Sequence, residues 1–188
     1  WVQDSSDIID FCEAAHPELP VVPDPATSPR QCLAAYLVEL LADEWMVVPG
    51  FWERWYFSEP GHGLNHLGFN EQQWGAVIAP TAEGPERRAA GASFFEAAFG
   101  ISTSRTAPRG VYAGLIHLGV DKNTEAAWQA SQHHLLGLLD THFGKHDYAL
   151  GGRPSLADFG LLAPLYAHLY RDAVPGYLMR SYFPVLCE

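Results

Sequence analysis

The chain has 188 residues and a formal net charge of −11 at pH 7, from 22 acidic and 11 basic side chains. Hydrophobic residues make up 48% of it and aromatic residues 13%, which is typical of a globular protein and not of a disordered one. The acidic balance, without basic clusters, argues against a nucleic-acid partner and against an anionic membrane surface. Its charge-free apolar stretches, such as residues 159–170, are shorter than the roughly 18 residues of a membrane-spanning helix. No N-terminal segment has the pattern of a secretion signal.

Three widely spaced cysteines, Cys12, Cys32 and Cys187, form no C-x-x-C pair. A sparse, odd number of cysteines is typical of the reducing cytosol, where a free thiol packs as a small apolar side chain. We therefore expect a cytoplasmic protein without disulfides.

The first 29 residues predict a short structured segment followed by a linker. Trp1-Val2-Gln3 is interpreted as the end of a strand, and Asp4-Ser5-Ser6 is expected to cap a short helix. Residues 17–29 contain five prolines, which fix φ and remove backbone donors, so this stretch predicts an extended linker. The expected division is 1–16, a linker over 17–29, and a second domain over 30–188.

The second domain is predicted to be helical. Its first helix has an apolar stripe, expected to face the core, at Leu33, Tyr36, Leu37, Leu40 and Leu41. Pro49-Gly50 is expected to bend or interrupt this helix, and residues 58–84, with little periodicity, predict a long loop. Pro85 and Gly100 bracket a further helix, and Thr124 and Gly144 bracket another.

A capping box predicts the start of the next helix. Ser155 and Asp158 have the spacing at which each side chain can satisfy the other residue's backbone N–H, and Pro154 and Phe159 have the spacing of a hydrophobic staple. The following residues are apolar on nearly all sides, so this helix is expected to be buried, with a kink at Pro164 and with His168 as a hydrogen-bonded core residue. The fold class is therefore all-α, a helical bundle preceded by a short strand–helix unit.

The run Gly-x-x-apolar-Ser-x-x-Asp-apolar that opens this helix, together with residues 160–172, resembles the C-terminal helical domain of the cytosolic glutathione transferase superfamily. The resemblance implies that residues 1–16 are the last strand and helix of a thioredoxin-like domain and that 30–188 is the helical domain. It also implies an enzyme that joins the glutathione thiolate to a small hydrophobic electrophile, with glutathione as co-substrate, and a homodimer.

Two groups of site residues follow from the resemblance. Asp4 and Ser5 correspond to the acidic-Ser motif that holds the γ-glutamyl end of glutathione, although ordinary N-capping needs the same residue types. The aromatic segment after the linker corresponds to the electrophile pocket, although its rings could equally pack the core; its residues are Trp52, Arg54, Trp55 and Tyr56.

No catalytic residue is predicted within the chain. In the family, the Ser, Tyr or Cys that activates the thiol lies near the start of the thioredoxin-like domain, so the chain by itself is expected to be inactive. The alternative function is a non-catalytic interaction or dimerisation module of the same fold. The histidine pairs 142/146 and 62/66 have i, i+4 spacing but are interrupted by glycines and lack Cys or Glu ligands nearby, so no metal site is predicted.

Overall fold

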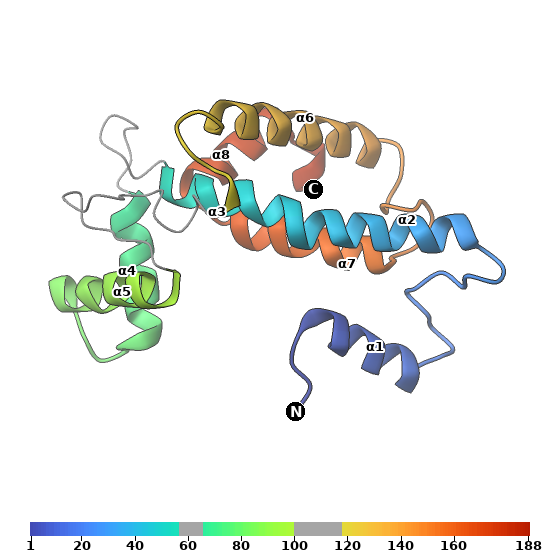
Figure 1. The fold of residues 1–188 in the computed structure, drawn as a ribbon, viewed down its shortest axis with the longest axis horizontal. Coiled ribbons are helices and arrows are strands. Elements are labelled where there is room, and N and C mark those ends of the chain that lie inside the picture. The colour runs from blue at the N-terminus through green and yellow to red at the C-terminus, as the bar shows by residue number, and fades with distance from the viewer. Residues whose placement is uncertain (57–65, 100–117) are drawn as a thin grey trace.

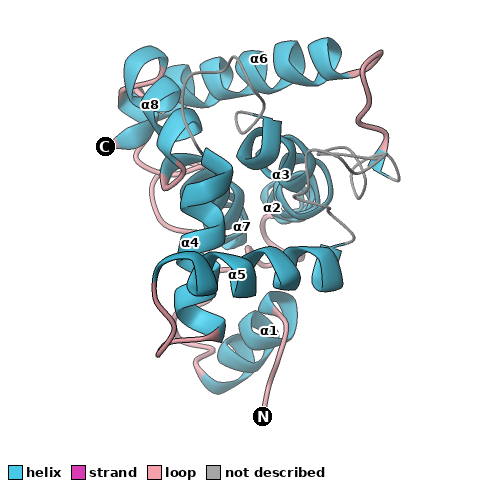
Figure 2. Ribbon diagram, turned by 90° about the vertical axis from the view of Figure 1, so that its left-hand side faces the viewer, coloured by secondary structure: helices cyan, strands magenta, loops and turns pink. Residues whose placement is uncertain are grey.

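The computed structural model of the chain describes residues 1–56, 66–99 and 118–188, with the side chains of residues 55, 56, 66, 67, 98 and 99 outside this description. Within these ranges every regular element is a helix and none is a strand (Figures 1 and 2), which confirms the all-α class. The elements are α1 (Ser5–Ala15), α2 (Pro29–Leu40), η1 (Leu41–Met46), α3 (Val47–Tyr56), α4 (His66–Ile78), α5 (Gly84–Phe99), α6 (Glu125–Phe143), α7 (Leu156–Leu162), η4 (Ala163–Tyr170), α8 (Ala173–Tyr182) and η5 (Val185–Cys187).

The expected helix near the N-terminus is confirmed, but the strand before it is wrong. Helix α1 begins at Ser5, and the Oδ1 atom of Asp4 accepts a hydrogen bond of 3.0 Å from the Ser6 N–H. Residues 1–3 are irregular. A strand needs a neighbouring strand to take up its backbone hydrogen bonds, and no described segment pairs with these residues.

Two long helical rods form the centre of the molecule. One runs through α2, η1 and α3, and the other through α7 and η4; η1 and η4 are π-helical. The first rod is not interrupted at Pro49-Gly50, because α3 continues through both residues. Pro164 lies at the start of η4, where the helix widens. A proline cannot donate to the carbonyl four residues back, and a widened turn lets a helix continue past such a position.

The rods run parallel and approach closely where each carries a glycine. A Cβ atom on Gly160 would lie 3.0 Å from the Cα of Glu39, and one on Gly50 would lie 3.0 Å from the Cβ of His168. Because both contacts advance in the same chain direction, the rods are parallel. Figure 1 shows them side by side beneath α6.

Helices α6 and α8 complete the core. Thr124 and Gly144 flank α6 as predicted. One hydrophobic cluster joins α6, η4, α8 and the residue after α8, and its buried members are Leu136, Leu169, Met179 and Phe183. A second cluster joins the two rods and consists of Ala42, Met46 and Leu161.

The predicted capping box is present at the start of α7. The Ser155 N–H donates to Oδ2 of Asp158 over 2.8 Å, and Oδ1 of Asp158 accepts from the Ala149 N–H over 2.7 Å. The linker reaches the same point, since the Leu156 N–H donates to the Val21 carbonyl over 3.0 Å. Pro154 and Phe159 both lie at the surface, however, and only one side of α7 is buried. The prediction of a helix buried all round is therefore wrong.

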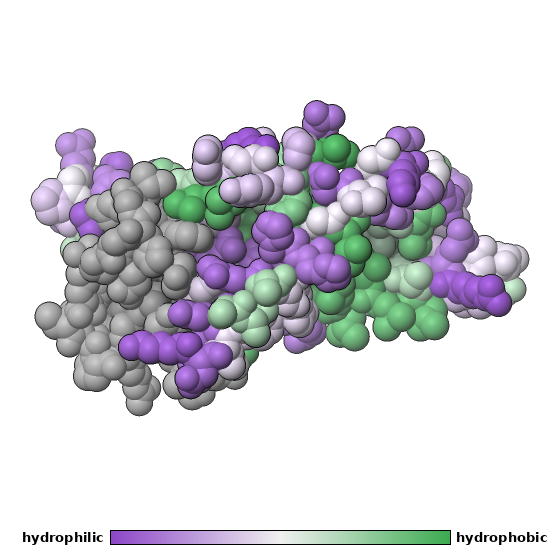
Figure 3. Space-filling view, turned by 90° about the horizontal axis from the view of Figure 1, so that it is seen from above, coloured by the Kyte–Doolittle hydropathy of each residue, from purple (hydrophilic) through white to green (hydrophobic). Residues whose placement is uncertain are grey.

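Four of the five residues of the predicted apolar stripe face solvent, which overturns the expectation that the stripe faces the core; only Leu41, at the start of η1, packs against a buried cluster. The exposed fractions of the four range from 47% to 62% at Leu33, Tyr36, Leu37 and Leu40. Figure 3 shows an extended hydrophobic area on this side of the molecule. Periodicity identifies side chains that share a face, but it does not identify what covers that face. In this structure α2 packs on α7 through its small residue Ala35 instead.

A helix lies within the segment predicted to be a loop. Residues 66–78 form α4, which packs closely against α5 at one end of the molecule (Figure 2). Gly75 and Gly91 permit the approach, because a Cβ atom at either would overlap the backbone carbonyl of Arg87 or Glu71, respectively. Nη2 of Arg88 also pairs with Oε2 of Glu71 at 2.6 Å. Tertiary packing of this kind leaves little periodicity in the sequence of α4, which is why the helix was not predicted.

Candidate functional site

The predicted glutathione-binding residues lie at the exposed N-terminus of α1. Asp4 has a φ of 88° and uses its carboxylate as the cap of the helix, and Ser5 is the first helical residue. The next residue, Ser6, donates its hydroxyl to Oε1 of Glu39 over 3.0 Å, which links α1 to α2. A helix N-terminus offers N–H groups and a partial positive charge to an anion.

The surroundings of this N-terminus are acidic. Burial raises the pKa of Asp43, and the negative charges of Glu39, Asp4 and Glu44 raise it further, in that order. Such a field favours an ammonium group and disfavours a carboxylate. The γ-glutamyl end of glutathione carries both groups, so this geometry suits its amine better than its acid.

The aromatic segment is divided between the core and a polar network. Trp52 has no exposed surface and packs in a cluster with Val48 and Val120. The side chains of Trp55 and Tyr56 lie outside the described residues. Trp52 therefore presents no surface on which a ligand could stack in this conformation.

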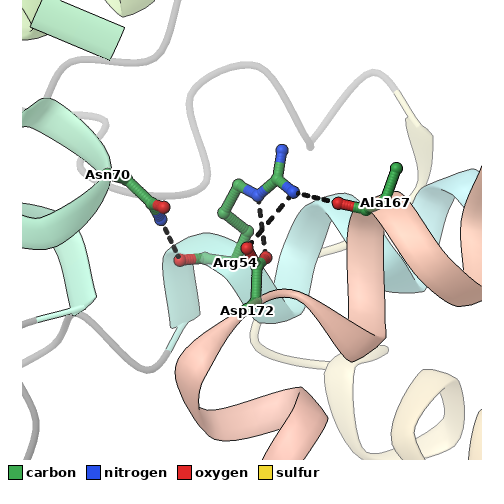
Figure 4. A network of polar contacts seen from close by, with 4 residues as sticks. All are labelled: Arg54, Asn70, Ala167 and Asp172. Atoms are coloured by element: carbon green, nitrogen blue, oxygen red, sulfur yellow. Dashed lines mark hydrogen bonds and ion pairs between the residues drawn. The ribbon is translucent and has the colours of Figure 1, made fainter. Parts of the chain in front are cut away.

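Arg54 connects three elements through a buried ion pair (Figure 4). Its Nε donates to Oδ2 of Asp172 over 2.8 Å, and its Nη2 donates to Oδ1 of Asp172 over 3.3 Å and to the Ala167 carbonyl over 2.8 Å. Only 13% of the Arg54 side chain and 7% of the Asp172 side chain are exposed. Asn70 of α4 donates to the Arg54 carbonyl over 3.4 Å. The guanidinium therefore holds the end of α3 against η4 and the start of α8.

Two further titratable side chains flank this ion pair. Burial lowers the pKa of His168, and the positive charge of Arg54 lowers it further, whereas Asp172 opposes the shift. His168 is the expected interior residue, but its buried Nδ1 has no hydrogen-bond partner among the described residues. Burial raises the pKa of Glu53 from its ordinary 4.5 to about 7, against a hydrogen bond from Gln132 that lowers it, and Asp172 raises it further.

Sequence reasoning missed Glu53, Gln132 and Asp172. A strongly shifted acid in a hollow is a recognised mark of a functional site. The one signal available in the sequence was a charged residue, Glu53, within an otherwise aromatic run. Its partner Gln132 comes from α6, 79 residues later in the chain.

Three hollows lined by described residues have the size of small-molecule sites. The first, of about 410 Å³, lies between the linker and the residues that precede α7. The other two lie between the helices. One, of about 550 Å³, lies along α7 and η4 and is lined by Leu161, Leu162, Leu165, Tyr166 and Tyr170, among others. The other, of about 400 Å³, lies between α3, α6 and α8 and contains Glu53 and Gln132. No group of three or more His, Cys, Asp or Glu side chains in the described ranges is arranged to hold a metal ion. None of the helices described reaches the length and apolarity needed to cross a bilayer.

Comparison of the chain with protein-family models, with curated proteins and with solved structures found no match.

Proposed function

We propose that this chain is the helical domain of a glutathione transferase-like protein and that it holds the hydrophobic electrophile attacked by the glutathione thiolate. The proposal starts from the resemblance of the Ser155–Asp158 segment and residues 160–172 to that family. It is supported by the all-helical architecture and by the capping box that fixes the start of α7.

The observation that carries the proposal is the hydrophobic groove along α7 and η4, of about 550 Å³. The helix that begins at the capping box forms one of its walls, and Asp158 itself lines the groove. Tyr166 and Tyr170 line it with nearly parallel rings, at 18° and 5.9 Å between centroids. The guanidinium carbon of Arg171 lies 5.9 Å from the centre of the Tyr166 ring. A flat, electron-poor aryl electrophile suits such electron-rich rings.

This proposal moves the electrophile from the expected aromatic segment to the groove. Trp52 is buried and Arg54 is committed to Asp172, and neither lines any of the hollows described above. Tyr166, by contrast, is half exposed on the wall of the groove. The glutathione amine would lie near Asp4 and Ser5, as the resemblance implies.

Ligand titration tests the proposal. An aryl halide should bind the chain saturably, and Tyr166→Ala should weaken binding about fivefold or more because it removes a stacking surface. Tyr177→Ala is the matched control, since Tyr177 is exposed on α8 and does not line the groove. With glutathione added, we expect no conjugation above the rate in buffer, because no residue of the chain is assigned to thiol activation. Absence of saturable binding, or equal effects of the two variants, would contradict the proposal.

A second candidate function is an interaction or dimerisation module, and the exposed stripe of α2 favours it. Four large side chains of one face are about half exposed or more, at Leu33, Tyr36, Leu37 and Leu40. A contiguous apolar surface of this kind is typical of a protein–protein contact. Sedimentation velocity combined with the aryl halide titration separates the two functions, because a homodimer is expected of the transferase as well and only the transferase should also bind the halide. A module should self-associate without binding the halide, and Leu37→Lys should abolish the association.

A further inference from the structure

A second hollow, separate from the proposed electrophile groove, carries its own chemistry. It lies between α3, α6 and α8 and has a volume of about 400 Å³. Most of its wall is apolar, with Leu136, Met179 and Phe183 at its inner side and Leu178 nearer the surface. An apolar hollow with a few convergent polar groups is the usual form of a small-molecule site.

Glu53 and Gln132 supply hydrogen-bond acceptors to this cavity, and its other polar residues, Gln129, His133 and Tyr182, are less buried than Gln132. Gln132 is only 4% exposed, and its side chain hydrogen-bonds to the carboxyl of Glu53. The Oε1 atom of Gln132 is buried and has no hydrogen-bond partner among the described residues. A buried amide oxygen without a donor is costly, so a group that could donate to it would be stabilised there.

Among the described residues, no cation pairs with the carboxyl of Glu53. Arg54, the next residue, is directed to Asp172 instead. Within the described part of the chain, the charged and titratable groups near Glu53 are Arg54 and Asp172, which pair with each other, and His133 and Tyr182, which line the same cavity. His133 packs edge-on against Phe183 with 4.8 Å between the ring centroids. The site therefore offers two acceptors and a negative charge inside an apolar wall.

We propose that this cavity binds a small organic amine, with its ammonium group held by the carboxylate of Glu53 and the amide oxygen of Gln132 and its apolar part against Phe183. An ammonium group carries three donors and one positive charge, so it can bond to both acceptors and neutralise the acid. An alcohol of the same shape can donate only once and brings no charge. A carboxylic acid would be repelled by Glu53 and Asp172.

The raised pKa of Glu53 gives the binding a definite pH dependence. With a pKa of about 7, this acid is mostly protonated at pH 6 and mostly ionised at pH 8. The amine binds the ionised form, so Glu53 must release its proton to solvent on binding at pH 6. The dissociation constant should therefore fall about tenfold between pH 6 and pH 8.

Isothermal titration calorimetry with 2-phenylethylamine tests the proposal, with 2-phenylethanol as the neutral analogue. We expect saturable binding of the amine, at least tenfold tighter than that of the alcohol at pH 8. Glu53→Gln should abolish both the preference for the amine and its pH dependence, while Glu96→Gln, an exposed residue of α5, should change neither. Gln132→Leu should weaken the binding of the amine and leave the binding of the alcohol nearly unchanged. Circular dichroism confirms that each variant is folded.

Equal binding of amine and alcohol, absence of saturable binding, or unchanged amine affinity in Glu53→Gln would overturn the proposal. The assay contains neither glutathione nor an electrophile, so its failure is distinguishable from failure of the transferase proposal. Tyr166→Ala provides the converse control, because Tyr166 does not line this cavity and its loss should leave amine binding unchanged.

Discussion

The buried ion pair of Arg54 and Asp172 makes a quantitative prediction about stability. Its side chains are 13% and 7% exposed, and two hydrogen bonds of 2.8 and 3.3 Å join them. Removing one partner leaves the other charge uncompensated inside the protein, which usually costs about 3–5 kcal/mol. Because Arg54 keeps some access to water and its bond to the Ala167 carbonyl, we take the lower end, about 3 kcal/mol, for Asp172→Leu.

A double-mutant cycle separates the pair from the general effect of mutation. Arg54→Met should also cost about 3 kcal/mol. The double variant leaves no charge unpaired and loses only the three hydrogen bonds of the Arg54 guanidinium, so it should cost about 3 kcal/mol in total and not about 6. The coupling free energy is then about 3 kcal/mol, a large part of the 5–15 kcal/mol that stabilises a typical domain.

Urea denaturation followed by circular dichroism measures these free energies. The matched control is Glu18→Gln, which removes the partner of His16 in an exposed pair, with side chains 68% and 63% accessible, and should leave the midpoint unchanged. A coupling free energy below about 0.5 kcal/mol would refute the reasoning, since it would mean that the two residues act independently.

Three further predictions concern packing, capping and pH. Gly91→Ala should destabilise the protein by about 2 kcal/mol or more, because the new Cβ would overlap the Glu71 carbonyl, whereas Gly152→Ala meets nothing within 4 Å and should be nearly neutral. Ser155→Ala should cost about 1 kcal/mol through loss of the capping box, and Ser181→Ala, at an exposed position, should cost less. The pKa of Glu53 is about 7 in the folded protein and 4.5 in the unfolded chain. Between these values the folded protein binds more protons than the unfolded chain, so the contribution of Glu53 to the free energy of unfolding falls as pH rises. Between pH 5 and pH 8, the free energy of unfolding of Glu53→Gln should therefore rise by roughly 2–4 kcal/mol relative to that of wild type.

Each of these has a clear contrary outcome. Equal midpoints for Gly91→Ala and Gly152→Ala would show that α4 and α5 do not approach as closely as described. A Ser155→Ala variant as stable as wild type would show that the cap is dispensable. A constant difference between Glu53→Gln and wild type across pH would show that Glu53 ionises normally. The lowered pKa of His168 makes the free energy of unfolding rise with pH below about 6.5, which partly masks the effect of Glu53. Because His168 is present in both proteins, its effect cancels when Glu53→Gln is compared with wild type.

Local signals in the sequence determined where several helices begin and end. Asp4 caps α1, Thr124 and Gly144 flank α6, and the Ser155 box opens α7, as the sequence predicted. These features depend on contacts between residues a few positions apart, so the sequence contains both partners of each interaction. The all-helical class followed from the same signals.

Tertiary structure alone decided which surfaces are covered and which side chains meet. The stripe of α2 was identified correctly as one face, yet it lies in solvent, because burial depends on the element that packs against it. Arg54 and Asp172 are 118 residues apart, and Glu53 meets Gln132 from another helix. No local pattern connects such residues, since their proximity arises only when separate helices pack together. For that reason the sequence predicted the helices of this protein better than it predicted the sites between them.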